Sequence, residues 1–185
     1  MEDILAKGSP FIGEKVQLRA VERTDLDKIM KYWNVFESRI GLGTIIPMSS
    51  MMEEDWIKST HEKAKNQTGY AFVIEHKETK ELLGTCGYES MNWIARSGVV
   101  GISIHNPENH NKGYGTDAML CLLRFGFEVI NLIRIELWVM DYNERAIHVY
   151  EKIGFKKVGK KRQAHYVQGS YHDILEMDIL RSEFE

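Results

Sequence analysis

A glycine-rich turn at residues 110–116 runs directly into a helical pattern, and this junction limits the folds open to the chain. The turn reads His-Asn-Lys-Gly-Tyr-Gly-Thr, and apolar residues then recur at helical spacing from Ala118 to Phe127. Glycines allow a tight turn that leaves N–H groups pointing outward. The first N–H groups of a helix have no partner within it, and the helix dipole makes that end positive. The junction therefore predicts an anion site suited to a pyrophosphate, to which Lys112 can add a charge.

A glycine pair before a helix is also common as a plain tight turn, so this segment has to be read in its context. Residues 113–118 fit the dinucleotide pattern Gly-x-Gly-x-x-Ala, and Glu136 stands near the place of a ribose-binding acid. That pattern requires a buried strand that leads straight into the glycines. Here seven loop residues, including Pro107, intervene, and the preceding strands have an antiparallel pattern. We therefore do not expect an NAD-binding fold.

Hydrophobic periodicity divides the chain into strands and helices. Helices are predicted after Thr24 as N-cap, from Ser50 with Glu53 in a capping box, after Gly115, and over 143–152 with Gly154 as C-cap. Strands are predicted near 15–20, 70–76, 81–89, 97–105, 134–140, 155–162 and 171–179.

This order of elements predicts the fold class. Consecutive strands pair as antiparallel hairpins, whereas strand–helix–strand crossovers give parallel pairs. We expect a single α/β (α+β) domain over residues 1–185, with a mixed, mostly antiparallel sheet of about seven strands and helices on both faces. Residues 1–13 carry little pattern and are expected to form an extended or mobile lead-in.

A second motif lies about 28 residues after the glycine turn, at residues 143–155. It reads Asn-Glu-Arg-Ala-Ile-His-Val-Tyr-Glu-Lys-Ile-Gly-Phe. Together the two motifs resemble those of the GNAT superfamily of N-acetyltransferases, over residues 15–180. The likeness is greatest to the branch that holds the ribosomal-protein N-terminal acetyltransferases (RimJ/RimL-like) and the bacterial spermidine acetyltransferases. The chain departs from the family's phosphate loop at His110, where Gln or Arg is usual, and at Asn111, where Gly is common.

The resemblance implies acetyl-CoA as cosubstrate, with no metal, and a splayed pair of central strands that holds its pantetheine arm. Gly101 is expected to mark a bulge in the first of these strands. Tyr150 is the expected proton donor to the leaving thiolate, and Asn143 binds the cofactor arm or simply caps its helix. The expected cofactor-binding residues are Ile102, Ser103, Ile104, His105, His110, Asn111, Lys112, Gly113, Tyr114, Gly115, Thr116, Asn143, Ala146 and Tyr150.

The general base is the least defined part of the predicted site. Relatives often carry Glu early in the strand before the phosphate loop, and the matching residue here is Val99, which cannot accept a proton. Glu89, Glu136 or water remain as candidates. A missing base favours an acceptor that loses its proton readily, and an α-amine has a pKa of ~7.7–8.0 against ~10.4 for a lysine-type amine. This argument favours a protein or peptide N-terminus.

Two other functions remain open. A polyamine acceptor would need an acidic pocket, for which Glu53, Glu54 and Asp55 are candidates, although they also suit a solvated helix start. A non-catalytic acyl-CoA-binding module on the same fold is the second alternative. The resemblance also leaves open whether the chain forms a homodimer.

Composition argues against several other classes. The net charge is −3, which is not typical of a nucleic-acid binder, and the basic run Lys156–Arg162 suits a solvated strand edge. No apolar stretch has the length of a membrane span. Cys86 and Cys121 have no metal-ligand spacing and are expected to be buried thiols. We therefore expect a cytoplasmic protein without a nucleic-acid or membrane partner.

Overall fold

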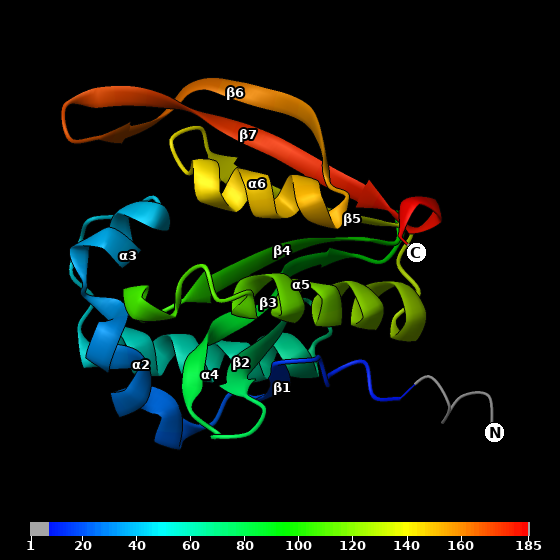
Figure 1. Ribbon diagram of the computed structural model, residues 1–185, viewed down its shortest axis with the longest axis horizontal. Coiled ribbons are helices and arrows are strands. Elements are labelled where there is room, and N and C mark those ends of the chain that lie inside the picture. The colour runs from blue at the N-terminus through cyan, green and yellow to red at the C-terminus, as the bar shows by residue number, and fades with distance from the viewer. Residues whose placement is uncertain (1–7, 185) are drawn as a thin grey trace.

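The computed structural model describes residues 8–184, and one seven-stranded sheet runs through them (Figure 1). The strand order is β1-β2-β3-β4-β5-β7-β6. Every neighbouring pair is antiparallel except β4 and β5, which are parallel. The strands are β1 (Val16–Ala20), β2 (Tyr70–His76), β3 (Leu82–Asn92), β4 (Ser97–Ile104), β5 (Arg134–Met140), β6 (Lys156–Val167) and β7 (Ser170–Leu180).

Helices cover both faces of this sheet, as the sequence predicts (Figure 1). Helices α5 and α6 contact each other on one face, and α2 and α4 contact each other on the other. The α-helices are α2 (Leu26–Trp33), α3 (Phe36–Gly41), α4 (Ser50–Lys65), α5 (Tyr114–Arg124) and α6 (Glu144–Ile153), and a π-helical turn, η3 (Phe125–Val129), extends α5. Short 3-10 turns are η1 (Arg23–Asp25), η2 (Pro107–Asn109) and η4 (Arg181–Glu183).

The main core lies between the sheet and α5. Tyr88 of β3 is almost fully buried, and its hydroxyl donates a hydrogen bond to the Leu122 carbonyl oxygen of α5 at 2.9 Å. Cys86 and Cys121 are free, buried thiols in the same cluster, which agrees with the sequence prediction. This packing fixes α5, and hence the glycine turn at its N-terminus, against the centre of the sheet.

The parallel strands β4 and β5 separate along their length, which confirms the predicted splay. They pair only through Ser97–Arg134, Gly98–Ile135 and Val99–Glu136. Beyond Val99, β4 continues to pair with β3 as far as Ile104, but its other edge faces a gap. Because backbone N–H groups alternate between the two edges of a strand, this free edge offers donors to an extended ligand.

The bulge beside this gap lies in a different strand from the one predicted. The register shifts between Tyr88 and Ser90 of β3, which pair with Val100 and Val99 of β4, so Glu89 is the extra residue. Gly101 itself pairs regularly with Gly87. A Cβ atom on Gly101 would lie 2.5 Å from Glu89 Oε1, so the glycine instead makes room for that carboxylate.

The helix starts in the first third of the chain also differ from the prediction. Thr24 lies inside the 3-10 turn η1 and is not an N-cap. Ser49 caps α4 by accepting a hydrogen bond from the Met52 N–H, one residue before the predicted cap at Ser50. Helix α3 was not predicted, because its six residues are too few to show a period.

Part of the predicted lead-in packs against the core. Residues 1–7 lie outside the described part of the chain, but the Phe11 ring is 5.2 Å from Phe125 and 5.5 Å from Phe72 between centroids. The Asp117 carboxylate in the first turn of α5 accepts hydrogen bonds from three consecutive N–H groups, of Glu14, Lys15 and Val16.

Within residues 8–184, no helix is both long and apolar enough to cross a membrane.

Candidate active site

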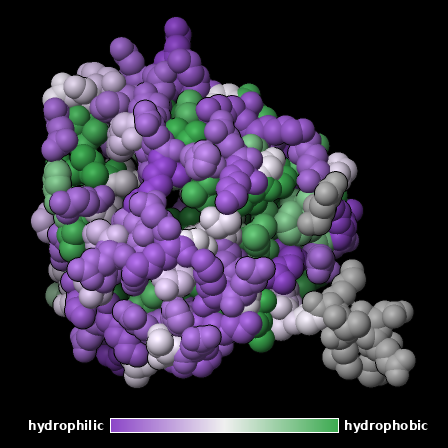
Figure 2. Space-filling view, in the orientation of Figure 1, coloured by the Kyte–Doolittle hydropathy of each residue, from purple (hydrophilic) through white to green (hydrophobic). Residues whose placement is uncertain are grey.

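A cavity of about 950 Å³ opens at the gap between β4 and β5 and extends to both faces of the sheet. On one side it is lined by the start of α5 and by α6, and on the other by residues of α3 and α4. Figure 2 shows the hollow near the centre of one face of the molecule, with a mostly hydrophilic rim. The predicted site residues that line it are Ile102, Ser103, Ile104, His110, Asn111, Gly113, Tyr114, Gly115, Thr116, Asn143, Ala146 and Tyr150.

The phosphate loop has the geometry of an anion cradle. Asn111 and Gly113 both have positive φ, 60° and 85°, and Gly113 is the N-cap of α5. Successive N–H groups in such a turn form a concave donor surface. A Cβ atom added at Gly115 would meet only Ile104 Cγ1, at 3.8 Å, so this surface is open for a ligand. The loop therefore fits the diphosphate of a coenzyme.

Two predicted cofactor residues do not line the cavity. The His105 N–H donates to the Leu83 carbonyl oxygen at 2.9 Å, and its own carbonyl accepts from Ser38 Oγ at 3.1 Å, so its backbone is occupied. The Lys112 ammonium is turned to Asn109 Oδ1 at 3.2 Å. For these two residues the structure gives no support to a role in cofactor binding.

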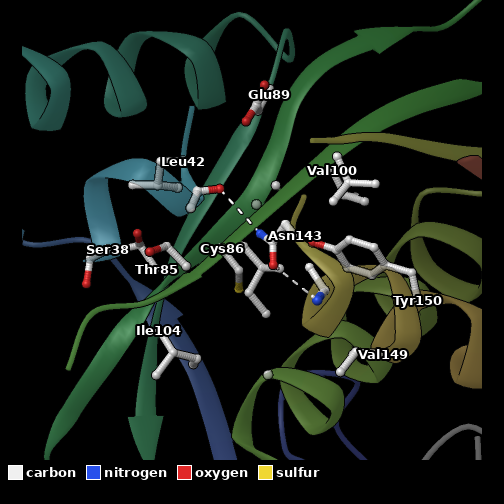
Figure 3. A pocket seen from close by; sticks show the side chains of 18 of the residues that line it. Ser38, Leu42, Thr85, Cys86, Glu89, Val100, Ile104, Asn143, Val149 and Tyr150 are labelled. Carbon is white, nitrogen blue, oxygen red and sulfur yellow. Dashed lines mark hydrogen bonds between the residues drawn. The ribbon is translucent and has the colours of Figure 1, made fainter. Parts of the chain in front are cut away.

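Asn143 is the N-cap of α6 and also forms a hydrogen bond to the end of α3. Its Oδ1 accepts from the Ala146 N–H at 3.2 Å, and its Nδ2 donates to the Gly41 carbonyl oxygen at 3.4 Å (Figure 3). One amide hydrogen remains for a ligand, so the capping and binding interpretations are compatible. The αL conformation of Gly154, with φ 115°, ends the same helix as predicted.

Tyr150 projects from α6 toward Asn143 and the gap (Figure 3). Burial raises its pKa to about 12, with opposing effects from the Arg145 charge, which lowers it, and the Glu89 charge, which raises it. The phenol is therefore protonated at neutral pH. Among the described residues its hydroxyl has no hydrogen-bond partner, and it remains available as a donor to an incoming group.

Of the two carboxylates that the sequence suggests as the general base, Glu89 and Glu136, the structure places only one in the cavity. Glu89 lines the cavity at the β3 bulge (Figure 3). Its charge raises the pKa of Tyr150. Glu136 lies outside the cavity, where it pairs with Arg134 at 3.1 Å. Val99 lines the cavity. Glu89 of β3 thus brings a carboxylate to the cavity wall beside β4, where Val99 has none.

The acidic cluster at 53–55 does not form an acceptor pocket, and none of its residues lines the cavity. Glu53 is 1% exposed, so it is not part of a solvated helix start either, and burial raises its pKa. Glu54 pairs with Arg23 at 2.7 Å, and Asp55 pairs with Lys58 at 3.1 Å. The acidic residues that do line the cavity are Glu37 and Glu89.

Sequence reasoning missed the residues that line the cavity opposite the phosphate loop. Trp33, Ser38 and Arg39 line the cavity from α2 and α3, and Trp56 lines it from α4. Arg39 is held by the Ile46 carbonyl oxygen at 2.8 Å and lies 5.5 Å from the Trp33 ring centroid. Arg145, inside the second motif, was also overlooked, although a cation two residues after Asn143 was a visible signal.

Comparisons with known proteins agree with this geometry. A spermidine N(1)-acetyltransferase from Vibrio cholerae is 32% identical over 184 residues, covering 94% of this chain and 97% of that protein. The crystal structure of spermidine N-acetyltransferase from Vibrio cholerae in complex with CoA and spermine superposes with a TM-score of 0.81 at 29% identity, over 91% of this chain and 97% of that one. The Bacillus subtilis protein YdaF, provisionally named a ribosomal N-acetyltransferase, is 32% identical over 56% of each chain.

The family assignment rests on the length of the match as well as on the motifs. The acetyltransferase (GNAT) domain description matches residues 15–156, which include the glycine turn, the splayed strands and α6. The predicted family, fold, enzyme class and cosubstrate are thereby confirmed. The chain belongs to the GNAT acetyltransferase family and is an acetyl-CoA-dependent N-acetyltransferase.

Proposed function

We propose that this enzyme acetylates a primary amine of a linear polyamine of the spermidine type. The observation that carries the proposal is the position of Glu89, at a strand bulge on the cavity wall, with Gly101 leaving room for its carboxylate. A carboxylate there would attract a cationic acceptor and accept its proton, directly or through water. The spermidine acetyltransferases among the relatives, which match over nearly the whole chain, support the same acceptor class.

This proposal replaces the preference for an α-amine. That preference depended on Val99 standing where relatives carry a base, so that only a weakly basic acceptor could react. Deprotonating a lysine-type amine at neutral pH costs ~3.4 kcal/mol more than deprotonating an α-amine. Glu89 gives the bound ammonium a proton acceptor inside the site, so the amine does not have to lose its proton in solution before it binds.

The rest of the reaction follows from the groups around the gap. The neutral amine attacks the thioester carbonyl carbon, the carbon–sulfur bond breaks, and the Tyr150 hydroxyl protonates the departing sulfur. The nitrogen loses its extra proton to solvent as the amide forms, and the Tyr150 phenolate regains a proton from solvent. Free N–H groups on the β4 edge polarise the carbonyl oxygen as negative charge develops on it. Holding the two reactants in this geometry lowers the barrier by up to ~7–11 kcal/mol in favourable cases.

The test compares acceptors in wild type and in Glu89→Gln. For spermidine, kcat/KM should fall on the order of 10²-fold in the variant, because it retains the shape but not the base. A peptide with a free N-terminus should lose less than about tenfold. Glu136→Gln is the matched control, since Glu136 lies outside the cavity, and should behave as wild type.

Steady-state kinetics at pH 7 decide between the two acceptors. If the wild-type enzyme uses the peptide with a kcat/KM at least tenfold above that for spermidine, the polyamine proposal is wrong and the N-terminal α-amine takes its place. If neither acceptor is acetylated while acetyl-CoA still binds, the polyamine proposal is wrong and the acceptor is an amine of another class.

A further inference from the structure

His110 of the phosphate loop joins the end of β4 to the start of α6. Its Nε2 lies 3.0 Å from the Ile104 carbonyl oxygen, and its Nδ1 is in contact with Nη1 of Arg145. A carbonyl oxygen can only accept, and a guanidinium can only donate. The proton of the ring therefore sits on Nε2, and the Nδ1 lone pair accepts from Arg145. These two contacts hold His110 in one neutral tautomer.

A neutral His110 leaves the phosphate loop without a cation that faces the cavity. Burial lowers the pKa of His110, and the Arg145 charge lowers it as well, against the opposing effect of the bond to Ile104. Lys112 does not line the cavity, and its ammonium is turned to Asn109. The loop offers N–H dipoles to a diphosphate, and a side-chain positive charge beside them inside the cavity comes from another element.

Arg145 supplies such a charge from the first turn of α6. It lines the same cavity as the loop residues Asn111, Gly113 and Gly115. Across residues 8–184, no carboxylate forms an ion pair with it. The contact with His110 uses one of its five N–H donors, and the others remain available for phosphate oxygens. Planar guanidinium groups bind such oxygens through paired hydrogen bonds.

We propose that Arg145 binds the diphosphate of acetyl-CoA. In this proposal His110 is a positioning residue, which orients the Arg145 guanidinium toward the diphosphate. The cation that this loop lacks is thus supplied from α6, 35 residues later in the chain. The diphosphate is favoured over the 3′-phosphate of the adenosine because Arg145 contacts the loop whose N–H groups form the anion cradle. The proposal concerns the cosubstrate and does not depend on which amine is the acceptor.

Three ligands test the assignment of Arg145. In Arg145→Ala, the Kd of CoA measured by calorimetry should rise about tenfold or more, and that of dephospho-CoA, which lacks only the 3′-phosphate, should rise by the same factor. With acetyl-pantetheine, which has no diphosphate, KM should stay within about threefold of the wild-type value. A loss confined to CoA would assign Arg145 to the 3′-phosphate, and unchanged affinity for both coenzymes would remove it from the site. Lys65→Ala, at the exposed end of α4 outside the cavity, controls for the loss of one positive charge.

A double-mutant cycle tests the positioning role of His110. His110→Ala should weaken CoA binding in the wild-type background but have little further effect in Arg145→Ala, because the histidine acts through the arginine. His110→Gln should restore binding, since an amide can donate to Ile104 and accept from Arg145 at the same time. Equal losses in both backgrounds would overturn the positioning role. Circular dichroism and thermal melts of each variant show whether the fold is retained.

Discussion

At the scale of single residues, buried polar groups support the cavity wall that we assign to the acceptor. His105 is 1% exposed, its Nε2 lies 3.2 Å from Thr85 Oγ1, and its ring centroid lies 4.9 Å from that of Trp33. Its carbonyl oxygen accepts from Ser38, which lines the cavity. The sequence assigned His105 to cofactor binding, but the residue lies outside the cavity and supports the wall through its bond to Ser38.

Burial of His105 has a consequence for stability in acid. Burial lowers its pKa from 6.5 to about 4, so the unfolded chain takes up a proton in this range that the folded chain does not. The free energy of unfolding should therefore fall as the pH drops from 6.5 to 4, by at most about 3 kcal/mol from this group. The measurement is urea unfolding of wild type and His105→Asn at pH 7, 5.5 and 4.

The comparison uses the pH dependence and not the absolute stability, because the substitution also removes a ring that packs on Trp33. His105→Asn should lose less stability than wild type between pH 6.5 and 4. Identical losses in the two proteins would mean that His105 is not held neutral by its surroundings.

At the scale of elements, the sequence predicted the strands and helices whose pattern lies within a short segment of the chain. The glycine turn and its helix, the capped helix α6 and the seven strands all carry their signals within about ten residues. Glu89 could not be chosen over Glu136 in this way, because its orientation depends on a bulge in β3 and on Gly101 in β4. The link between His110 and Arg145 joins two motifs that were recognised separately, and the sequence does not show that they touch.

The start of α5 gives a direct test of the anion cradle. Gly115→Glu places a negative carboxylate on the surface that we assign to the diphosphate, and the new Cβ atom would meet only Ile104 Cγ1, at 3.8 Å. The fold should survive, and CoA should no longer raise the Tm, because a ligand stabilises only the state that binds it. Gly115→Ala, which adds one methyl group and no charge, should keep most of the shift. A normal CoA-dependent Tm shift in folded Gly115→Glu would contradict this assignment.

At the scale of the whole molecule, we assign the cosubstrate and the acceptor to opposite faces of the sheet. Helices α5 and α6 present the phosphate loop, Arg145 and Tyr150, whereas α3, α4 and the β3 bulge form the acceptor side. The gap between β4 and β5 is where the two sides meet. The central claim is that the sulfur of acetyl-CoA and the acceptor amine meet there, within reach of the Tyr150 hydroxyl.

Steady-state kinetics of Tyr150→Phe with acetyl-CoA and spermidine test this claim most directly. The substitution keeps the ring and its packing, with Phe155 at 5.8 Å between centroids, and removes only the proposed proton donor. We predict that kcat falls on the order of 10²-fold, while KM for acetyl-CoA changes much less, because the proton is transferred only in the transition state. A kcat within about threefold of wild type in the folded variant would contradict the account.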